Sequence, residues 1–215
     1  LPIYPFSNEI KLIIAPEVAV SFPLHLRIPS WCKSASVLIN GKKWKDQAGG
    51  QITIIDREWN KGDVVRLTFP MEITTSRWFE NSVAVERGPL VYALKIEENW
   101  KYVKNNDKWG NYWEVKPGTP WNYGILNKAV QDPSNGFYVI ETSEKPDYPW
   151  NLENSPIMIK TKGKLIPDWK LYNAATGPLP HSGPQRNLIN EPADNITLIP
   201  YGCTTLRITE FPVAE

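Results

Sequence analysis

Acidic side chains are the first residues in this sequence whose chemistry could be catalytic. Two carboxylates held several ångströms apart across a sugar, one of them with a raised pKa, can act as general acid and base on a glycosidic bond. The candidates are Glu86, Glu97, Glu98, Asp56 and Asp63. None is singled out, because two are adjacent on the chain and the others sit beside Arg87, Arg57 or Lys61. We therefore expect solvated or ion-paired surface carboxylates.

The cysteines and histidines form no recognisable nucleophile or metal motif. Cys32 and Cys203 lie far apart, without a Cys-x-x-Cys partner or a histidine at ligand spacing, so no zinc site is expected. His25 and His181 have no Ser or Cys motif beside them, and a Ser-His-Asp arrangement has no spacing to support it. Two free, buried thiols are expected, and a disulfide is the alternative.

The aromatic residues of the sequence could bind a ligand by stacking. The sequence holds 10 Trp, and after Glu97 several of them stand between Pro, Gly and Asn. Because the apolar face of a sugar stacks on a flat ring, such residues on loops could form a carbohydrate-binding surface. The candidates are Trp109, Tyr112, Trp113, Trp121, Tyr123 and Trp150. The alternative is burial in a core or between domains, which is also the interpretation of Trp31, Trp44 and Trp59 beside strands or turns.

Composition excludes several classes of function. The chain has 215 residues, enough for one large or two small domains, and 24 basic against 23 acidic residues give a net charge of +1. No long Lys/Arg cluster occurs, so neither nucleic acid nor a membrane is expected as a partner. Leu1 to Pro5 lacks the pattern of a signal peptide, and no long apolar run occurs. The localisation of the chain stays open, and a secreted or periplasmic location is the expectation only for a longer parent protein.

The first 95 residues have the alternation of half-buried strands. Residues 22–28 alternate apolar and polar side chains, and Val65, Leu67 and Phe69 form a later apolar face. Asn40-Gly41 is the dipeptide that best tolerates positive φ at both central positions of a type I′ turn, so it predicts a hairpin. Gly88-Pro89 predicts a bend between two further strands. About seven short strands at near-regular spacing indicate an antiparallel sandwich.

The pattern changes after residue 95 and returns near residue 196. Strands are predicted at 137–141, 157–161 and 170–173, between long loops, and the stretch 101–110 is polar. Regular alternation resumes in residues 196–211. The predicted fold is all-β, with two antiparallel β-sandwich domains, the second inserted before the last strands of the first. The first domain would comprise 1–95 plus 196–215, and the Trp-rich second domain 96–195.

Seven blocks, in order, carry a resemblance to a known family. They are Leu26 to Cys32, Asn40-Gly41, Arg57-Glu58-Trp59 with Gly62-Asp63, Phe69-Pro70-Met71, Glu86 to Leu94, Trp121 to Gly124, and Leu198 to Pro212. With this set the chain resembles the region after the catalytic barrel in glycoside hydrolase family 127 (GH127), the β-L-arabinofuranosidase type of bacterial enzyme. The match is weakest in Trp100 to Gly118 and between Asp132 and Leu165.

The resemblance implies a role without catalysis of its own. In such proteins an (α/α)6 barrel carries a cysteine nucleophile beside zinc, and the β-sandwiches follow the barrel. The chain would begin where that barrel ends, so no catalytic, cofactor-binding or metal-binding residue is carried over, Cys32 included. The implied partner is the catalytic barrel of the same parent protein. A plant-type carbohydrate and a second copy of the chain are further candidate partners, and the alternative role is a carbohydrate-binding module.

Overall fold

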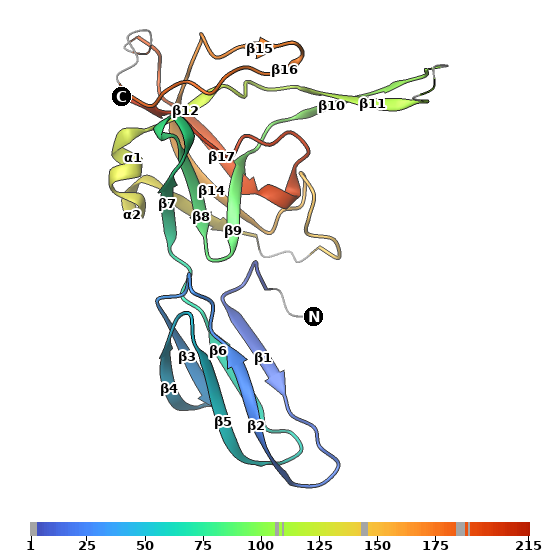
Figure 1. The fold of residues 1–215 in the computed structure, drawn as a ribbon, viewed down its shortest axis with the longest axis vertical. Helices are drawn as coiled ribbons and strands as arrows, with labels where there is room; N and C mark the ends of the chain where they lie inside the picture. Colours follow the sequence, from blue (N-terminus) through green and yellow to red (C-terminus); the bar gives the residue numbers. More distant parts are fainter. Residues whose placement is uncertain (1–3, 106–107, 109, 143–145, 184–187, 189) are drawn as a thin grey trace. The chain divides into compact units, whose positions relative to one another are not determined.

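The computed structural model describes residues 4–105, 108, 110–142, 146–183, 188 and 190–215. Most of the regular structure is β, and the chain divides into two compact units, Leu1–Glu72 (unit 1) and Ile73–Glu215 (unit 2) (Figure 1). The prediction of a β protein is confirmed at this level. Among the described residues, no helix is both long and apolar enough to cross a bilayer.

Unit 1 consists of two antiparallel sheets around one hydrophobic core (Figure 1). The four-stranded sheet has the order β1-β6-β3-β4, and the two-stranded sheet pairs β2 with β5. The bounds are β1 Glu9–Ile13, β2 Val20–Arg27, β3 Ser34–Ile39, β4 Lys42–Ala48, β5 Ile52–Trp59 and β6 Val64–Thr68.

Alternating side chains of these strands fill the core of unit 1. Val65, Leu67 and Phe69 are buried, as the sequence predicted, because every second residue of a strand faces the same side. Trp59, at the end of β5, is fully buried, and its ring packs against Phe22 with 5.9 Å between ring centroids. The core therefore contains the residues that the alternation selected.

A network of hydrogen bonds joins two turns of unit 1. Asn40 and Gly41 have φ values of 51° and 77°, which confirms the predicted turn between β3 and β4. The Asn40 amide donates to the Asp63 carboxylate at 2.7 Å, and the same carboxylate accepts from the backbone N–H of Asn60 at 2.9 Å. The Asn60 hydrogen bond, followed by that of Asn40, lowers the pKa of Asp63. The ion-paired interpretation of Asp63 is confirmed, since its carboxylate lies 3.8 Å from the Arg57 guanidinium. The side chain is buried, however, and not on the surface, because it holds the two turns together.

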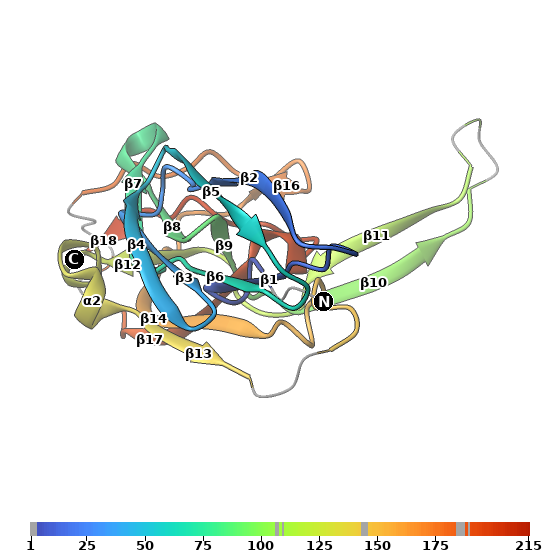
Figure 2. The same ribbon diagram turned by 90° about the horizontal axis from the view of Figure 1, so that it is seen from below.

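Unit 2 is built on one large curled sheet (Figures 1 and 2). Its order is β18-β12-β14-β17-β9-β8-β7, and β13 also pairs with β14. All pairs are antiparallel except β12 with β18, which is parallel and departs from the purely antiparallel prediction. The bounds are β7 Ile73–Arg77, β8 Val83–Arg87, β9 Leu90–Leu94, β12 Tyr123–Leu126, β13 Tyr138–Glu141, β14 Ile157–Leu165, β17 Asp194–Pro200 and β18 Val213–Ala214.

Smaller elements surround this sheet. Two hairpins, β10 with β11 and β15 with β16, pair separately from it. In Figures 1 and 2 the β10–β11 hairpin extends away from the curled sheet of unit 2. The bounds are β10 Glu98–Val103, β11 Tyr112–Pro117, β15 Leu171–Tyr172, β16 Ala175–Thr176, α1 Asn127–Gln131, α2 Pro133–Gly136, and the 3-10 turns Phe79–Asn81 and Tyr201–Cys203.

The division into units differs from the boundary predicted near residue 95, which falls inside unit 2. Strands β8 and β9 meet at the predicted Gly88-Pro89 bend, where Gly88 has a φ of 60°. On its other edge β9 pairs with β17, and β17 in turn pairs with β14. The strand near the C-terminus thus does pair with a strand of the first 95 residues, but within a sheet that belongs to unit 2.

Candidate binding surfaces and their relatives

One face of the β10–β11 hairpin is aromatic. The register pairs Trp100 with Val115 and Tyr102 with Trp113, so these four side chains share one face of the hairpin. The Trp113 ring lies 5.0 Å from Tyr102 and 6.2 Å from Trp100, measured between ring centroids. Trp100, Tyr102 and Trp113 are each about half exposed, at 52%, 45% and 58%. We call these three side chains the aromatic face.

Glu98 fixes the base of this hairpin. One carboxylate oxygen accepts hydrogen bonds from the backbone N–H groups of Thr205, at 2.5 Å, and Leu206, at 3.1 Å, and from the Thr204 hydroxyl at 2.9 Å. The other oxygen accepts from the indole N–H of Trp100 at 3.1 Å. Burial acts to raise the pKa of Glu98, but these donors together lower it. Glu98 is thus an anchor for the chain near residue 205, and not the solvated carboxylate expected from the sequence.

An apolar hollow continues from the aromatic face at the base of the hairpin. Val115 and Pro117 of β11 line it together with Trp121, Leu171 and Ile208. Its volume is about 590 Å³. Leu171, on β15, is 54% exposed, so apolar surface extends from the hairpin through the hollow to β15.

The six aromatic residues selected from the sequence occupy different surroundings. Tyr112 and Trp113 lie on β11, but only Trp113 belongs to the aromatic face, since Tyr112 pairs with Val103 on the opposite face. Trp109 lies outside the described residues. Trp121 packs on the buried Trp169 with 5.0 Å between ring centroids, and the Tyr123 hydroxyl donates to Asp194 at 3.0 Å.

Trp150 is half-buried against the chain at Gly202. A Cβ added to Gly202 would lie 2.8 Å from the Trp150 ring, so the ring rests directly on the backbone there. Trp121, Tyr123 and Trp150 therefore have packing roles inside unit 2. Of the five candidates that the structure describes, Trp113 alone lies in an exposed aromatic cluster. Whether any of the six contacts a carbohydrate stays a prediction.

Sequence reasoning missed Trp100 and Tyr102 as members of the aromatic face. The polar composition of residues 101–110 suggested a loop, whereas β10 runs from Glu98 to Val103. The available signal was the alternation of Trp100 and Tyr102 with Asn99 and Lys101, which is typical of a strand.

Comparison with known proteins finds a family model that matches most of unit 1. Residues 2–71 match the family described as the β-L-arabinofuranosidase GH127 middle domain. The resemblance to GH127 is confirmed. The match covers nearly the whole of unit 1 and ends close to the boundary between the two units. No curated protein sequence matches the chain.

Three solved structures share the fold over nearly the whole length of the chain. Ara127N, a GH127 β-L-arabinofuranosidase from Geobacillus stearothermophilus T6, is 24% identical and superposes with a TM-score of 0.57 over 99% of the chain. A glycoside hydrolase at 22% identity (TM-score 0.56, 99% of the chain) and a GH127 β-arabinofuranosidase at 21% (TM-score 0.59, 98%) are similar. The chain spans 29%, 31% and 30% of these three proteins, respectively.

The zinc and cysteine nucleophile implied by the GH127 resemblance do not fit the residues of this chain. Cys32 and Cys203 are free and buried, and they belong to different units. Burial raises the pKa of both thiols, which disfavours the reactive thiolate. In the part of the chain that the structure describes, no group of three or more His, Cys, Asp or Glu could hold a metal ion. We therefore derive no catalytic step through zinc.

The remaining titratable candidates have structural partners or lie exposed. Arg87 pairs with Glu141 at 3.2 Å, and Glu86 accepts a hydrogen bond from Ser76 at 3.0 Å. His181 pairs with Glu80 at 2.9 Å. His25 is exposed on β2, as its place in the alternation predicted. These contacts do not bring two carboxylates together across a cleft.

Proposed function

We propose that the chain is a non-catalytic accessory β region of a bacterial glycoside hydrolase of the β-L-arabinofuranosidase type, and that it packs on an (α/α)6 catalytic barrel. The observation that carries this proposal is the match of residues 2–71 to a GH127 middle domain. The chain covers less than a third of each solved relative, which leaves room in such proteins for a separate catalytic domain.

Unit 1 has a surface suited to packing against another domain. In this proposal its two sheets form a small β-sandwich, with β2 and β5 as one layer. The outer face of β5 carries Ile52 and Ile54, which are 62% and 50% exposed although they are apolar. Their partners across the register are Arg27 and His25. Adjacent apolar side chains on the outside of a sheet are typical of an interface.

Activity measurements test the absence of catalysis. The chain should release no 4-nitrophenol from 4-nitrophenyl β-L-arabinofuranoside above the buffer rate, with or without zinc and a thiol reductant. A saturable rate that disappears in Cys32→Ala would overturn the proposal.

The coding sequence upstream of the Leu1 codon provides a second test. It should encode an (α/α)6 barrel, and a start codon directly before Leu1 would contradict this.

The aromatic face favours a second candidate function, carbohydrate binding by unit 2. Three half-exposed rings on a hairpin that extends from the sheet are accessible to a ligand. In an affinity gel containing arabinan, the wild-type chain should be retarded, and Trp113→Ala should weaken retention at least about fivefold, or about 1 kcal/mol, as expected for an aromatic residue at the centre of a contact.

Trp78→Ala is the matched control for this experiment. Trp78 and Trp113 are both 58% exposed, but Trp78 lies apart from the hairpin, at the end of β7, where its indole N–H donates to Ser76. Retention should be unchanged in this variant. Absence of retardation of the wild-type chain, together with unchanged tryptophan fluorescence, would exclude binding of this polysaccharide.

A further inference from the structure

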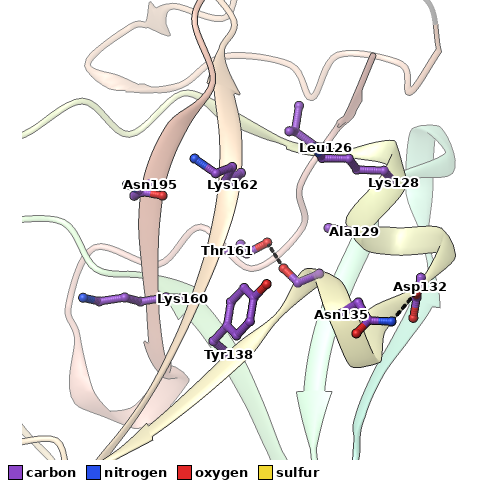
Figure 3. A pocket seen from close by; sticks show the side chains of 11 residues that line it. Leu126, Lys128, Ala129, Asp132, Asn135, Tyr138, Lys160, Thr161, Lys162 and Asn195 are labelled. Carbon is purple, nitrogen blue, oxygen red and sulfur yellow. Dashed lines mark hydrogen bonds between the residues drawn. The ribbon is translucent and has the colours of Figure 1, made fainter.

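Unit 2 contains a second hollow, separate from the aromatic face. It is lined by the two short helices α1 and α2 and by residues of β12, β13, β14 and β17, and its volume is about 710 Å³ (Figure 3). In Figure 3, Lys160, Lys162 and Asn195 lie on one side of this hollow, and Lys128, Ala129 and Asn135 lie on the other. We call it the lysine hollow.

Strand alternation places the lysines on its floor. In β14, Ile157, Ile159 and Thr161 are buried on one side, which directs Lys160 and Lys162 to the other side, where both are exposed. The register sets Lys160 beside Tyr138 of β13 and Lys162 beside Asn195 of β17. Successive outward residues on a strand are about 6.7 Å apart. The Lys160 and Lys162 side chains therefore leave the backbone at neighbouring positions on the same side of β14.

The helical wall of the hollow is fixed to β14 through Thr161, whose side chain lies on the opposite side of the strand from Lys160 and Lys162. The Thr161 hydroxyl donates to the backbone carbonyl of Gly136, at the end of α2, at 2.7 Å. A Cβ at Gly136 would lie 2.3 Å from Cα of Ala129, so only glycine permits this close approach of α1 and α2. The wall is thus held by packing and by a buried hydroxyl.

The charge of the hollow is positive. Lys128, Lys160 and Lys162 line it, and within the described residues none of the three makes an ion pair. Asp132 is the one acidic residue among the described lining side chains, and its carboxylate already accepts hydrogen bonds from Ser134 and Asn135, each at 2.7 Å. The Asn135 and then the Ser134 hydrogen bonds lower the pKa of Asp132. Three ammonium groups against one carboxylate favour an anion.

The other lining groups suit a sugar. The Tyr138 ring is 64% exposed, although tyrosine is often half-buried in a strand, and it offers a flat apolar surface beside the lysines. The Asn195 side chain, beside Lys162, can donate to and accept from hydroxyl groups. The Tyr138 ring can stack on the apolar face of a sugar, and the Asn195 amide can bond its hydroxyl groups. The lysines can bind its carboxylate.

We propose that the lysine hollow binds an acidic oligosaccharide, with carboxylate groups on Lys160 and Lys162 and a sugar ring over Tyr138. A polyphosphate or nucleic acid ligand is less well matched, because the described lining residues include no arginine to bind phosphate in a bidentate manner. The inference does not depend on the accessory role, which rests on unit 1, so either can fail alone.

Calorimetric titration of the full chain with trigalacturonate at low salt tests this proposal. We expect saturable binding that weakens as salt is raised, because exposed charges are screened. Fully methyl-esterified trigalacturonate, which has the same sugars without charge, should bind at least about threefold more weakly. Equal binding of the ester, or no binding of the acid, would overturn the proposal.

Two pairs of variants locate the site. Lys160→Gln with Lys162→Gln should weaken binding about threefold to tenfold, since each exposed ion pair contributes modestly. The control, Lys42→Gln with Lys61→Gln, removes the same charge from exposed positions of unit 1 and should leave the affinity unchanged. Equal losses in the two double variants would show binding by net charge alone and would overturn the site.

Two further measurements, with Tyr138 variants and with tripolyphosphate, distinguish a sugar-binding site from a site that binds any anion. Tyr138→Ala should weaken trigalacturonate binding, whereas Tyr138→Phe, which keeps the ring, should not. Tripolyphosphate should bind more weakly than trigalacturonate. If tripolyphosphate binds more tightly and Tyr138→Ala has no effect, the hollow is a phosphate site and the proposed ligand class is wrong.

Discussion

Replacing Trp59 with alanine should destabilise unit 1 by about 3–5 kcal/mol, the range observed when a large aromatic side chain is removed from a core. The Trp59 side chain is fully buried, and its ring contacts Phe22. Its indole N–H donates to the backbone carbonyl of Phe22 at 3.0 Å, which joins β5 to β2 through a side chain as well as through the sheet. Alanine would leave a cavity and remove this side-chain hydrogen bond.

Urea unfolding followed by circular dichroism measures this effect. Because the chain has two units, the transition should be fitted for each unit separately if two transitions are seen. Trp44→Ala is the control: Trp44 lies on β4 of the same unit, is 37% exposed and contacts Lys45, so its loss should cost less than about 1 kcal/mol. Equal effects of the two substitutions would show that Trp59 does not hold the core.

The fold of unit 1 could largely be predicted from sequence because its determinants are local. The alternation that ends in Val65, Leu67 and Phe69 selects the buried face without knowledge of the partner strand. Asn40-Gly41 selects the turn through its own backbone preference. The sheet pairs β3 with β4 directly across this turn.

Unit 2 was harder to predict because its sheet depends on distant pairing. The partner of Leu94 in β9 is Leu198 in β17, with more than a hundred residues between them. No local pattern in the sequence shows that β17 pairs with the free edge of β9. The strands between residues 73 and 95 could therefore not be assigned to unit 2 from the sequence. The parallel pair of β12 and β18 is short, with only Ile125–Val213 and Leu126–Ala214 in register, and gives no sequence signal.

The candidate surfaces show the same limit. Exposed aromatic residues could be identified by type, but their grouping depends on the register that pairs Tyr102 with Trp113. The lysine hollow needs three strands and two helices, and Lys160 and Lys162 look like an ordinary solvated strand face in the sequence. Glu98 was misread for a related reason, since three of its four donors lie more than a hundred residues away, at Thr204 to Leu206.

Removing the Glu98 side chain should destabilise unit 2 by about 2 kcal/mol. Hydrogen bonds to a charged group contribute about 1.5–3 kcal/mol each when well buried, but solvent reaches part of this carboxylate, so the sum is reduced. Glu98→Ala leaves the N–H groups of Thr205 and Leu206 without their acceptor. Glu98→Gln keeps an oxygen acceptor but loses the charge, and should cost about half as much. Thermal unfolding monitored by calorimetry gives the difference.

The pH dependence of this effect has a defined sign. The pKa of Glu98 is lower in the folded chain than its ordinary value of 4.5, so the unfolded chain binds a proton at a higher pH than the folded chain. The stability contributed by the charge is therefore complete above pH 4.5 and is lost as the pH falls through the folded pKa. The difference in unfolding free energy between the wild-type chain and Glu98→Gln should be constant at neutral pH and should shrink under acid conditions.

Glu97→Ala provides the matched control, since Glu97 is the exposed neighbour and only its backbone groups bond to Thr119 and Gly118. Its stability should change by less than about 0.5 kcal/mol and should follow the wild-type pH profile. A stability difference for Glu98→Gln that grows on acidification would contradict the lowered pKa. If it does shrink, the carboxylate acts in its charged form, and the position of the aromatic face depends on an anchor near residue 205 that the hairpin sequence does not contain.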